Sequence, residues 1–168
     1  MHLDLASALN LISTLAIVGA LIFTGLQVRE ANRARRDQAS VAVIQTTQSE
    51  GWTRALELLA RLPENAGVKE IEQSPPEMQR ALLEFGVRLE TIGYMVYRRI
   101  VDLDTVDDLI GGVTLMYWSR AKGWAEQQRE RTGNAKFLEW GQWITAQVAE
   151  RHAKGLHRPA YLRDLHWR

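Results

Sequence analysis

The stretch LIFTGLQVREANRARRDQAS, residues 21–40, changes character at one point. It is apolar up to Val28, and the eight residues that follow contain four arginines and one glutamate. The apolar side of this boundary extends back to Asp4, so that 24 consecutive residues carry no charged side chain. As a helix they would be about 36 Å long, whereas the hydrocarbon core of a bilayer is about 30 Å thick. The sequence therefore predicts a membrane-spanning helix over residues 1–28.

Two other interpretations of this apolar segment are open. A cleaved signal peptide has a basic beginning and a small-residue cleavage site. This chain begins with MHLDLAS, and TGLQVRE at the far end of the segment offers no such site. A buried helix of a soluble domain would tolerate the polar residues in the run, but 24 uncharged residues are long for such a helix. We therefore favour a membrane span.

The arginines after the span predict its orientation, because Lys and Arg that flank a span stay on the cytoplasmic side. Only His2 and Asp4 stand before the span. We expect a single pass through a cell inner membrane, with the N-terminus outside and the rest of the chain in the cytoplasm. Anionic lipid headgroups would attract these arginines at about 1 kcal/mol each, or the arginines only set the topology. They are Arg29, Arg33, Arg35 and Arg36.

Small and polar residues inside the predicted span recur at steps of three or four, which places them on one helical stripe. Small residues let helices approach closely in lipid, and Asn, Ser, Thr and Gln can hydrogen-bond across the contact. The stripe predicts a helix partner in the membrane, either a second copy or a larger complex, although ordinary composition would also produce it. Its members are Ala6, Asn10, Ser13, Ala16, Ala20, Thr24 and Gln27.

The rest of the chain predicts helices, so the expected fold is all-α. Residues 29–62 are expected to form a juxtamembrane helix that continues the span, with Gly51 as its weakest point because glycine lowers helix stability. Residues 63–155 are expected to form a small cytoplasmic helical bundle. Its apolar positions recur at helical spacing, and they are Met78, Leu82, Phe85, Leu89, Ile92, Val96 and Ile100 in the clearest helix, residues 74–100.

Local signals place the ends of the bundle helices. Ser74 and Glu77 have the spacing of a capping box, with Pro75 at the first helical position. In residues 101–112, four aspartates do not match a calcium loop, and we expect a short helix that begins at Asp104 and ends at the following glycine pair. Further helices are expected over 113–131 and 135–153.

The search for catalytic, cofactor or metal motifs in the sequence gives no match. There is no cysteine. His152 and His157 are five residues apart and would not share a helix face, so no metal site is expected. Glu84 and Glu90 flank an arginine and are expected to form salt bridges at the rim of the core, and not an acid–base pair. We expect no cofactor, no small-molecule substrate and no enzyme activity.

Charge argues against nucleic acid as a partner. Residues 37–150 contain 12 basic and 17 acidic side chains, whereas residues 151–168 contain five basic and one acidic. The basic, aromatic tail over 156–168 would suit the membrane surface, or would fold against the acidic body, or would fray. The tail residues singled out are Tyr161, Arg163, Trp167 and Arg168.

The layout resembles a group of bacterial single-pass membrane proteins that carry a helical domain of unknown function. The resemblance rests first on GLQVREANRARRDQA, residues 25–39, at the end of the apolar helix. It extends to FGVRLETIGYMVYRRIVDLDTVDDLIGG, residues 85–112, and to YWSRAKGWAEQQRERTGNAKFLEWGQWI, residues 117–144. The resemblance implies an anchor followed by helices, and it implies no activity, cofactor or catalytic residue.

These features favour a membrane-anchored interaction protein, an accessory or scaffolding subunit of a membrane complex or a homo-oligomer. A signalling or defence effector that disturbs the membrane is an alternative, which dye leakage on expression would support. An enzyme with an unrecognised site is a further alternative, which a deep pocket with convergent polar groups would support.

Overall fold

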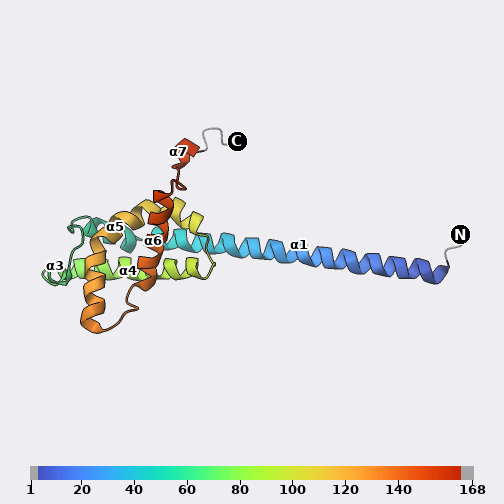
Figure 1. Cartoon of the computed structure of the whole chain (residues 1–168), viewed down its shortest axis with the longest axis horizontal. Coiled ribbons are helices and arrows are strands. Elements are labelled where there is room, and N and C mark those ends of the chain that lie inside the picture. The colour runs from blue at the N-terminus through green and yellow to red at the C-terminus, as the bar shows by residue number, and fades with distance from the viewer. Residues whose placement is uncertain (1–3, 164–168) are drawn as a thin grey trace. The chain divides into compact units, whose positions relative to one another are not determined.

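The computed structural model describes residues 4–163, apart from the side chains of residues 5–8, 35, 36, 42, 160 and 163. Helices joined by turns make up this part of the chain, which contains no strand (Figure 1). The predicted all-α fold is therefore confirmed. The chain divides into two units, one ending at Gln38 and one beginning at Ala39.

Helix α1, Leu5–Thr47, is continuous over 43 residues and supplies all the described helical structure of the first unit. As predicted, the helix continues through the boundary between the apolar run and the arginines. Gly19 and Gly25 do not interrupt it, and a Cβ atom at either position would meet nothing within 4 Å. The last turns of α1 belong to the second unit, where Val43 is buried in the core.

The predicted single helix over residues 29–62 is wrong, because the chain turns between α1 and α2, Glu50–Leu59. Ser49 is the N-cap of α2, and its Oγ accepts a hydrogen bond from the backbone N–H of Trp52 at 3.2 Å. This cap supplies the partner that a new helix N-terminus needs. The break therefore lies at Ser49, before Gly51.

Helix α4, Pro76–Tyr97, follows the short helix α3, Val68–Glu72. The predicted capping box at its start is wrong, since Pro75 is the N-cap and the Ser74 hydroxyl donates instead to the carbonyl of Glu70 at 2.7 Å. The predicted buried face is confirmed from Met78 to Val96, whereas Ile100 lies beyond the helix end and is exposed.

Helix α5, Leu103–Thr132, joins two segments that the sequence analysis expected to be separate helices. It ends at Gly133, whose φ of 68° is the left-handed conformation that glycine adopts without strain. Gly111 lies inside α5 and does not stop it. A Cβ atom at Gly111 would come within 2.3 Å of Asp107 Oδ1 and 3.3 Å of Val148 Cγ1. The lack of a side chain at this position therefore lets these two residues pack against α5.

Helix α6 spans Glu139–Ala153 and therefore begins four residues later than predicted. Gly155, with a φ of 67°, turns the chain after it, and the short helix α7, Ala160–Arg163, follows. In the second unit α4 packs against both α2 and α6, and α5 packs against α6. The core between these helices includes Leu59, Leu82, Phe85, Leu89, Ile92, Val106 and Ile144.

Candidate functional site

The apolar part of α1 is exposed along its whole described length. Eleven large apolar side chains between residues 9 and 28 are 47–68% exposed, and this is the helix in the described part of the chain that is long and apolar enough to cross a membrane. Every predicted stripe residue from Asn10 to Gln27 is exposed. The Thr24 hydroxyl donates to the carbonyl of Ala20 at 2.8 Å, within its own helix.

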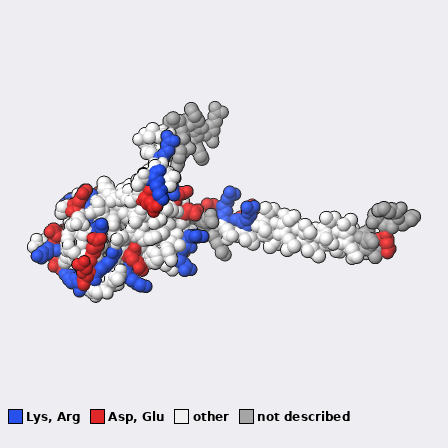
Figure 2. Space-filling view, viewed as in Figure 1, with Lys and Arg blue, Asp and Glu red and all other residues white. Residues whose placement is uncertain are grey.

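The predicted arginine cluster follows this uncharged stretch directly. Arg29 and Arg33 are exposed and lie one helical turn apart, with Glu30 between them. Figure 2 shows the basic side chains gathered where the uncharged part of α1 ends. Arg35 and Arg36 belong to the same helix, but their side chains lie outside the description.

The predicted tail site is described only in part. Tyr161 is 73% exposed on α7. The side chain of Arg163 and all of Trp167 and Arg168 lie outside the described residues. The choice between membrane surface and protein body as the partner of this tail therefore stays a prediction.

A group of charged and imidazole side chains, which we call the Asp107 cluster, joins α5 to the end of α6. It consists of Asp104, Asp107, Arg151, His152 and His157. Asp107 lies on the buried face of α5, and its side chain is only 2% exposed. Burial of a carboxylate is costly unless partners satisfy it, and every other member of the cluster approaches this carboxylate or its partner arginine.

Arg151 and His152, in the last turns of α6, bind both oxygens of Asp107. Arg151 Nε donates to Oδ2 at 3.1 Å, and His152 Nε2 lies 2.8 Å from Oδ1. Arg151 Nη2 also pairs with Asp104 Oδ1 at 2.7 Å, so this arginine joins the two aspartates. Asp104 was expected to begin a helix, and it lies in the first turn of α5, which begins at Leu103 after the N-cap Asp102; it also makes this ion pair.

His157 reaches the same carboxylate from beyond α6. Its Nδ1 lies 3.4 Å from Asp107 Oδ1, and its ring stacks on that of His152 with centroids 4.1 Å apart. The two histidines do not share a helix face, as expected, because α6 ends at Ala153. The turn at Gly155 nevertheless brings His157 back beside His152. The three side chains Asp107, His152 and His157 form the group of possible metal ligands found among the described residues.

The two glutamates that flank Arg88 have separate structural roles. Glu84 pairs with Arg88 at 2.7 Å, which confirms the rim salt bridge for this residue. Glu90 does not take part in that pair, because its Oε2 accepts the backbone N–H of Gly141 at 2.8 Å, at the N-terminus of α6. Burial raises the pKa of Glu90 above its usual value, although the hydrogen bond from the Gly141 backbone opposes the shift.

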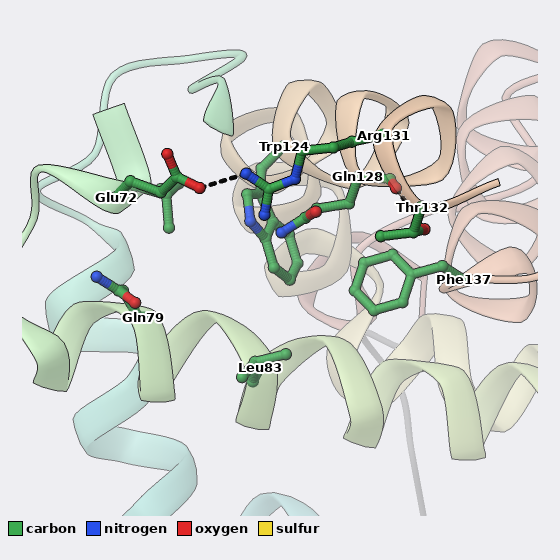
Figure 3. A pocket seen from close by; sticks show the side chains of 9 residues that line it. Glu72, Gln79, Leu83, Trp124, Gln128, Arg131, Thr132 and Phe137 are labelled. Carbon is green, nitrogen blue, oxygen red and sulfur yellow. Dashed lines mark hydrogen bonds and ion pairs between the residues drawn. The ribbon is translucent and has the colours of Figure 1, made fainter. Parts of the chain in front are cut away.

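A hollow of about 280 Å³ lies between α3, α4 and α5 (Figure 3). Apolar walls come from Ile71, Leu83, Trp124 and Phe137, and Arg131 pairs with Glu72 at its edge. Gln128 Oε1 is buried without a hydrogen-bond partner. Ligand pockets commonly enclose about 300–1,000 Å³, so this hollow is small, and its two charged groups already bind each other.

Comparison with known families identifies the chain. A family model described as a domain of unknown function, DUF4760, matches residues 14–147, which include most of the apolar segment and the helices up to α6. Comparison with curated proteins and with solved structures gave no match. The predicted resemblance to a family with a domain of unknown function is confirmed, and the chain belongs to the DUF4760 family.

Proposed function

We propose that this chain is a membrane-anchored interaction protein of a bacterium, in which α1 crosses the inner membrane once and the helical unit binds or positions a protein partner. The exposed apolar surface of α1 carries the proposal. Burial of a large aliphatic or aromatic side chain is worth about 1.5–3 kcal/mol, and eleven such side chains are exposed between residues 9 and 28. Exposure of these side chains to water forgoes this free energy, whereas a lipid environment would supply it.

The backbone of α1 also suits a span. Its hydrogen bonds are satisfied within one helix, as a bilayer interior requires. Thr14 and Thr24 direct their hydroxyl donors to carbonyls of the preceding turn, Asn10 and Ala20. These two polar residues therefore add little cost in hydrocarbon, and the first charged side chain after the run is Arg29.

The proposed orientation places the N-terminus outside and the helical unit in the cytoplasm, because the arginines follow the span. A reporter fused after the C-terminus should then be fluorescent as a cytoplasmic protein and inactive as alkaline phosphatase. Replacement of Arg29, Arg33, Arg35 and Arg36 by glutamine should raise phosphatase activity. The same number of substitutions at exposed arginines far from the span provides the control. High phosphatase activity of the unchanged fusion would refute the orientation.

A partner within the membrane is the second part of the proposal, and the stripe from Asn10 to Gln27 is its contact face. Ala16→Leu with Ala20→Leu keeps the segment apolar but holds a neighbouring helix away. Interhelical contacts of this kind are worth about 1 kcal/mol, so crosslinking in native membranes should fall several-fold. Leu15→Ala with Ile22→Ala changes other faces and should have a smaller effect. If only this control pair weakens crosslinking, the partner packs elsewhere.

A further inference from the structure

We infer that Asp107, His152 and His157 form a binding site for a divalent transition-metal ion of the zinc class. The donor set consists of two imidazole nitrogens and one carboxylate oxygen, which are the ligand types that zinc accepts in proteins. Each of these three donor atoms lies within 4.8 Å of the other two. The inference is independent of the membrane function proposed above.

The distances are close to those of a bound ion. Donors bonded to a tetrahedral zinc ion at about 2.0–2.1 Å lie about 3.3 Å from one another. Asp107 Oδ1 and His157 Nδ1 are already 3.4 Å apart, whereas His152 Nε2 is 2.8 Å from the same oxygen. The two rings are stacked with their centroids 4.1 Å apart and their planes at 21°, so one imidazole must turn out of the stack before both nitrogens point at one ion. Both nitrogens face Oδ1, so the ion would take the place of the imidazole protons directed at this oxygen.

The surroundings of Asp107 hold its carboxylate in one orientation. Arg151 Nε binds Oδ2, which leaves Oδ1 to the two imidazoles. Gly111, one helical turn after Asp107, leaves the space that the carboxylate occupies, because a Cβ atom there would lie 2.3 Å from Oδ1. Outer partners of this kind fix ligand orientation and commonly change metal affinity by about 10–100-fold.

Charge and access also suit a cation. Asp104 and Asp107 together carry two negative charges, and Arg151 supplies one positive charge between them. With neutral imidazoles the cluster therefore has a net charge of −1. The carboxylate of Asp107 is buried, but the side chains of His152 and His157 are 28% and 24% exposed. An ion can thus reach the site from solvent on the imidazole side, and three protein ligands leave a fourth position for water.

Zinc titration of the full chain tests the inference. The protein is purified in mild detergent, treated with a chelator and titrated with zinc chloride in a calorimeter. We expect one ion per chain and a higher melting temperature in its presence, because an ion that binds only the folded state stabilises it. Magnesium chloride should not reproduce either effect, since Mg²⁺ prefers oxygen ligands. Absence of zinc binding would overturn the inference and leave the cluster as an ion-pair network.

A pair of variants locates the ion. His157 lies outside the helices of the core. Its replacement, His157→Ala, should weaken zinc binding at least about tenfold, since loss of even an outer partner of a ligand lowers metal affinity by that factor. Glu150→Gln removes a carboxylate from the same end of α6 that pairs with Lys154, and it should leave zinc affinity unchanged. Equal affinity of His157→Ala and the unchanged chain would place the ion elsewhere and overturn the assignment.

Nitrogen NMR of the unchanged chain supplies a readout that does not depend on how the variants fold. Zinc should shift the resonances of His152 Nε2 and His157 Nδ1, the two nitrogens that face Asp107 Oδ1. Shifts at the opposite ring nitrogens alone would contradict the proposed ligand set.

Discussion

Leu89→Ala should lower the free energy of unfolding by about 2–5 kcal/mol, the range for removing a large aliphatic side chain from a packed core. Leu89 is 0% exposed on α4, which packs against both α2 and α6. Its Cγ lies 3.6 Å from the place that a Cβ atom would take at Gly141, so α6 closes directly over it. The backbones on both sides limit collapse into the vacated space. Denaturant unfolding followed by tryptophan fluorescence measures the loss.

Val87→Ala, two residues away on the same helix, is the matched control. Val87 is 59% exposed, and its truncation should change the free energy of unfolding by less than about 0.5 kcal/mol. Gln79 would be a poorer control, because it is half-buried, lines the hollow beside Glu72 and donates to the carbonyl of Ser74. A loss for Val87→Ala as large as that for Leu89→Ala would show that the buried face is assigned wrongly.

The buried faces could be predicted because helical spacing depends only on local periodicity. Met78, Phe85 and Leu89 follow one another at steps that keep them on one side of any helix, and all three are buried. The core forms wherever such faces meet, so this prediction needs no knowledge of the neighbours. The continuous α1 could be predicted for a similar reason, since no proline interrupts it.

Helix ends were harder to predict, because the same residue type or spacing can either end a helix or serve a contact within a continuous one. The pair Gly111–Gly112 has the composition of a helix stop, yet Gly111 makes room for Asp107 and Val148 within a continuous helix. Ser74 and Glu77 have the spacing of a capping box, but Ser74 hydrogen-bonds back to Glu70. Tertiary contacts decide between such alternatives, and a single sequence does not contain them.

The Asp107 cluster was missed because His152 and His157 were compared on one continuous helix. Gly155 separates them, and a glycine at the end of a helical pattern is itself a turn signal. The predicted helix over 135–153 already ends before Gly155, so His157 stood outside it and the comparison of helix faces did not settle its position. The pairing with Asp107 could not have been found in this way, since it joins residues 45 positions apart.

Gly93→Ala should destabilise the fold by about 1–3 kcal/mol, although alanine is the better helix former by up to about 1 kcal/mol. Gly93 lies on the face of α4 that meets α6. A Cβ atom there would come within 2.2 Å of the carbonyl oxygen of Trp140 and 2.7 Å of its carbonyl carbon. Backbone atoms cannot turn aside as a side chain can, so the two helices would have to separate.

Separation of α4 from α6 would extend beyond the substituted residue, because other contacts join the same two helices. The Trp140 ring packs against Tyr97 at a centroid distance of 4.3 Å, and Glu90 accepts the backbone N–H of Gly141 at 2.8 Å. Both contacts lie within one or two turns of Gly93 and should weaken when the helices move apart. We therefore expect Gly93→Ala to reduce near-ultraviolet dichroism from the aromatic residues as well as the melting temperature.

Gly112→Ala supplies a control with the opposite expected sign. Gly112 is an exposed position inside α5, and a Cβ atom there would meet nothing within 4 Å. The same substitution should stabilise the fold by about 0.5–1 kcal/mol, because alanine loses less conformational entropy than glycine when the helix forms. The two variants share their chemistry and differ only in what surrounds the new methyl group. If both raise the melting temperature, α4 and α6 do not approach as closely at Gly93 as the structure places them.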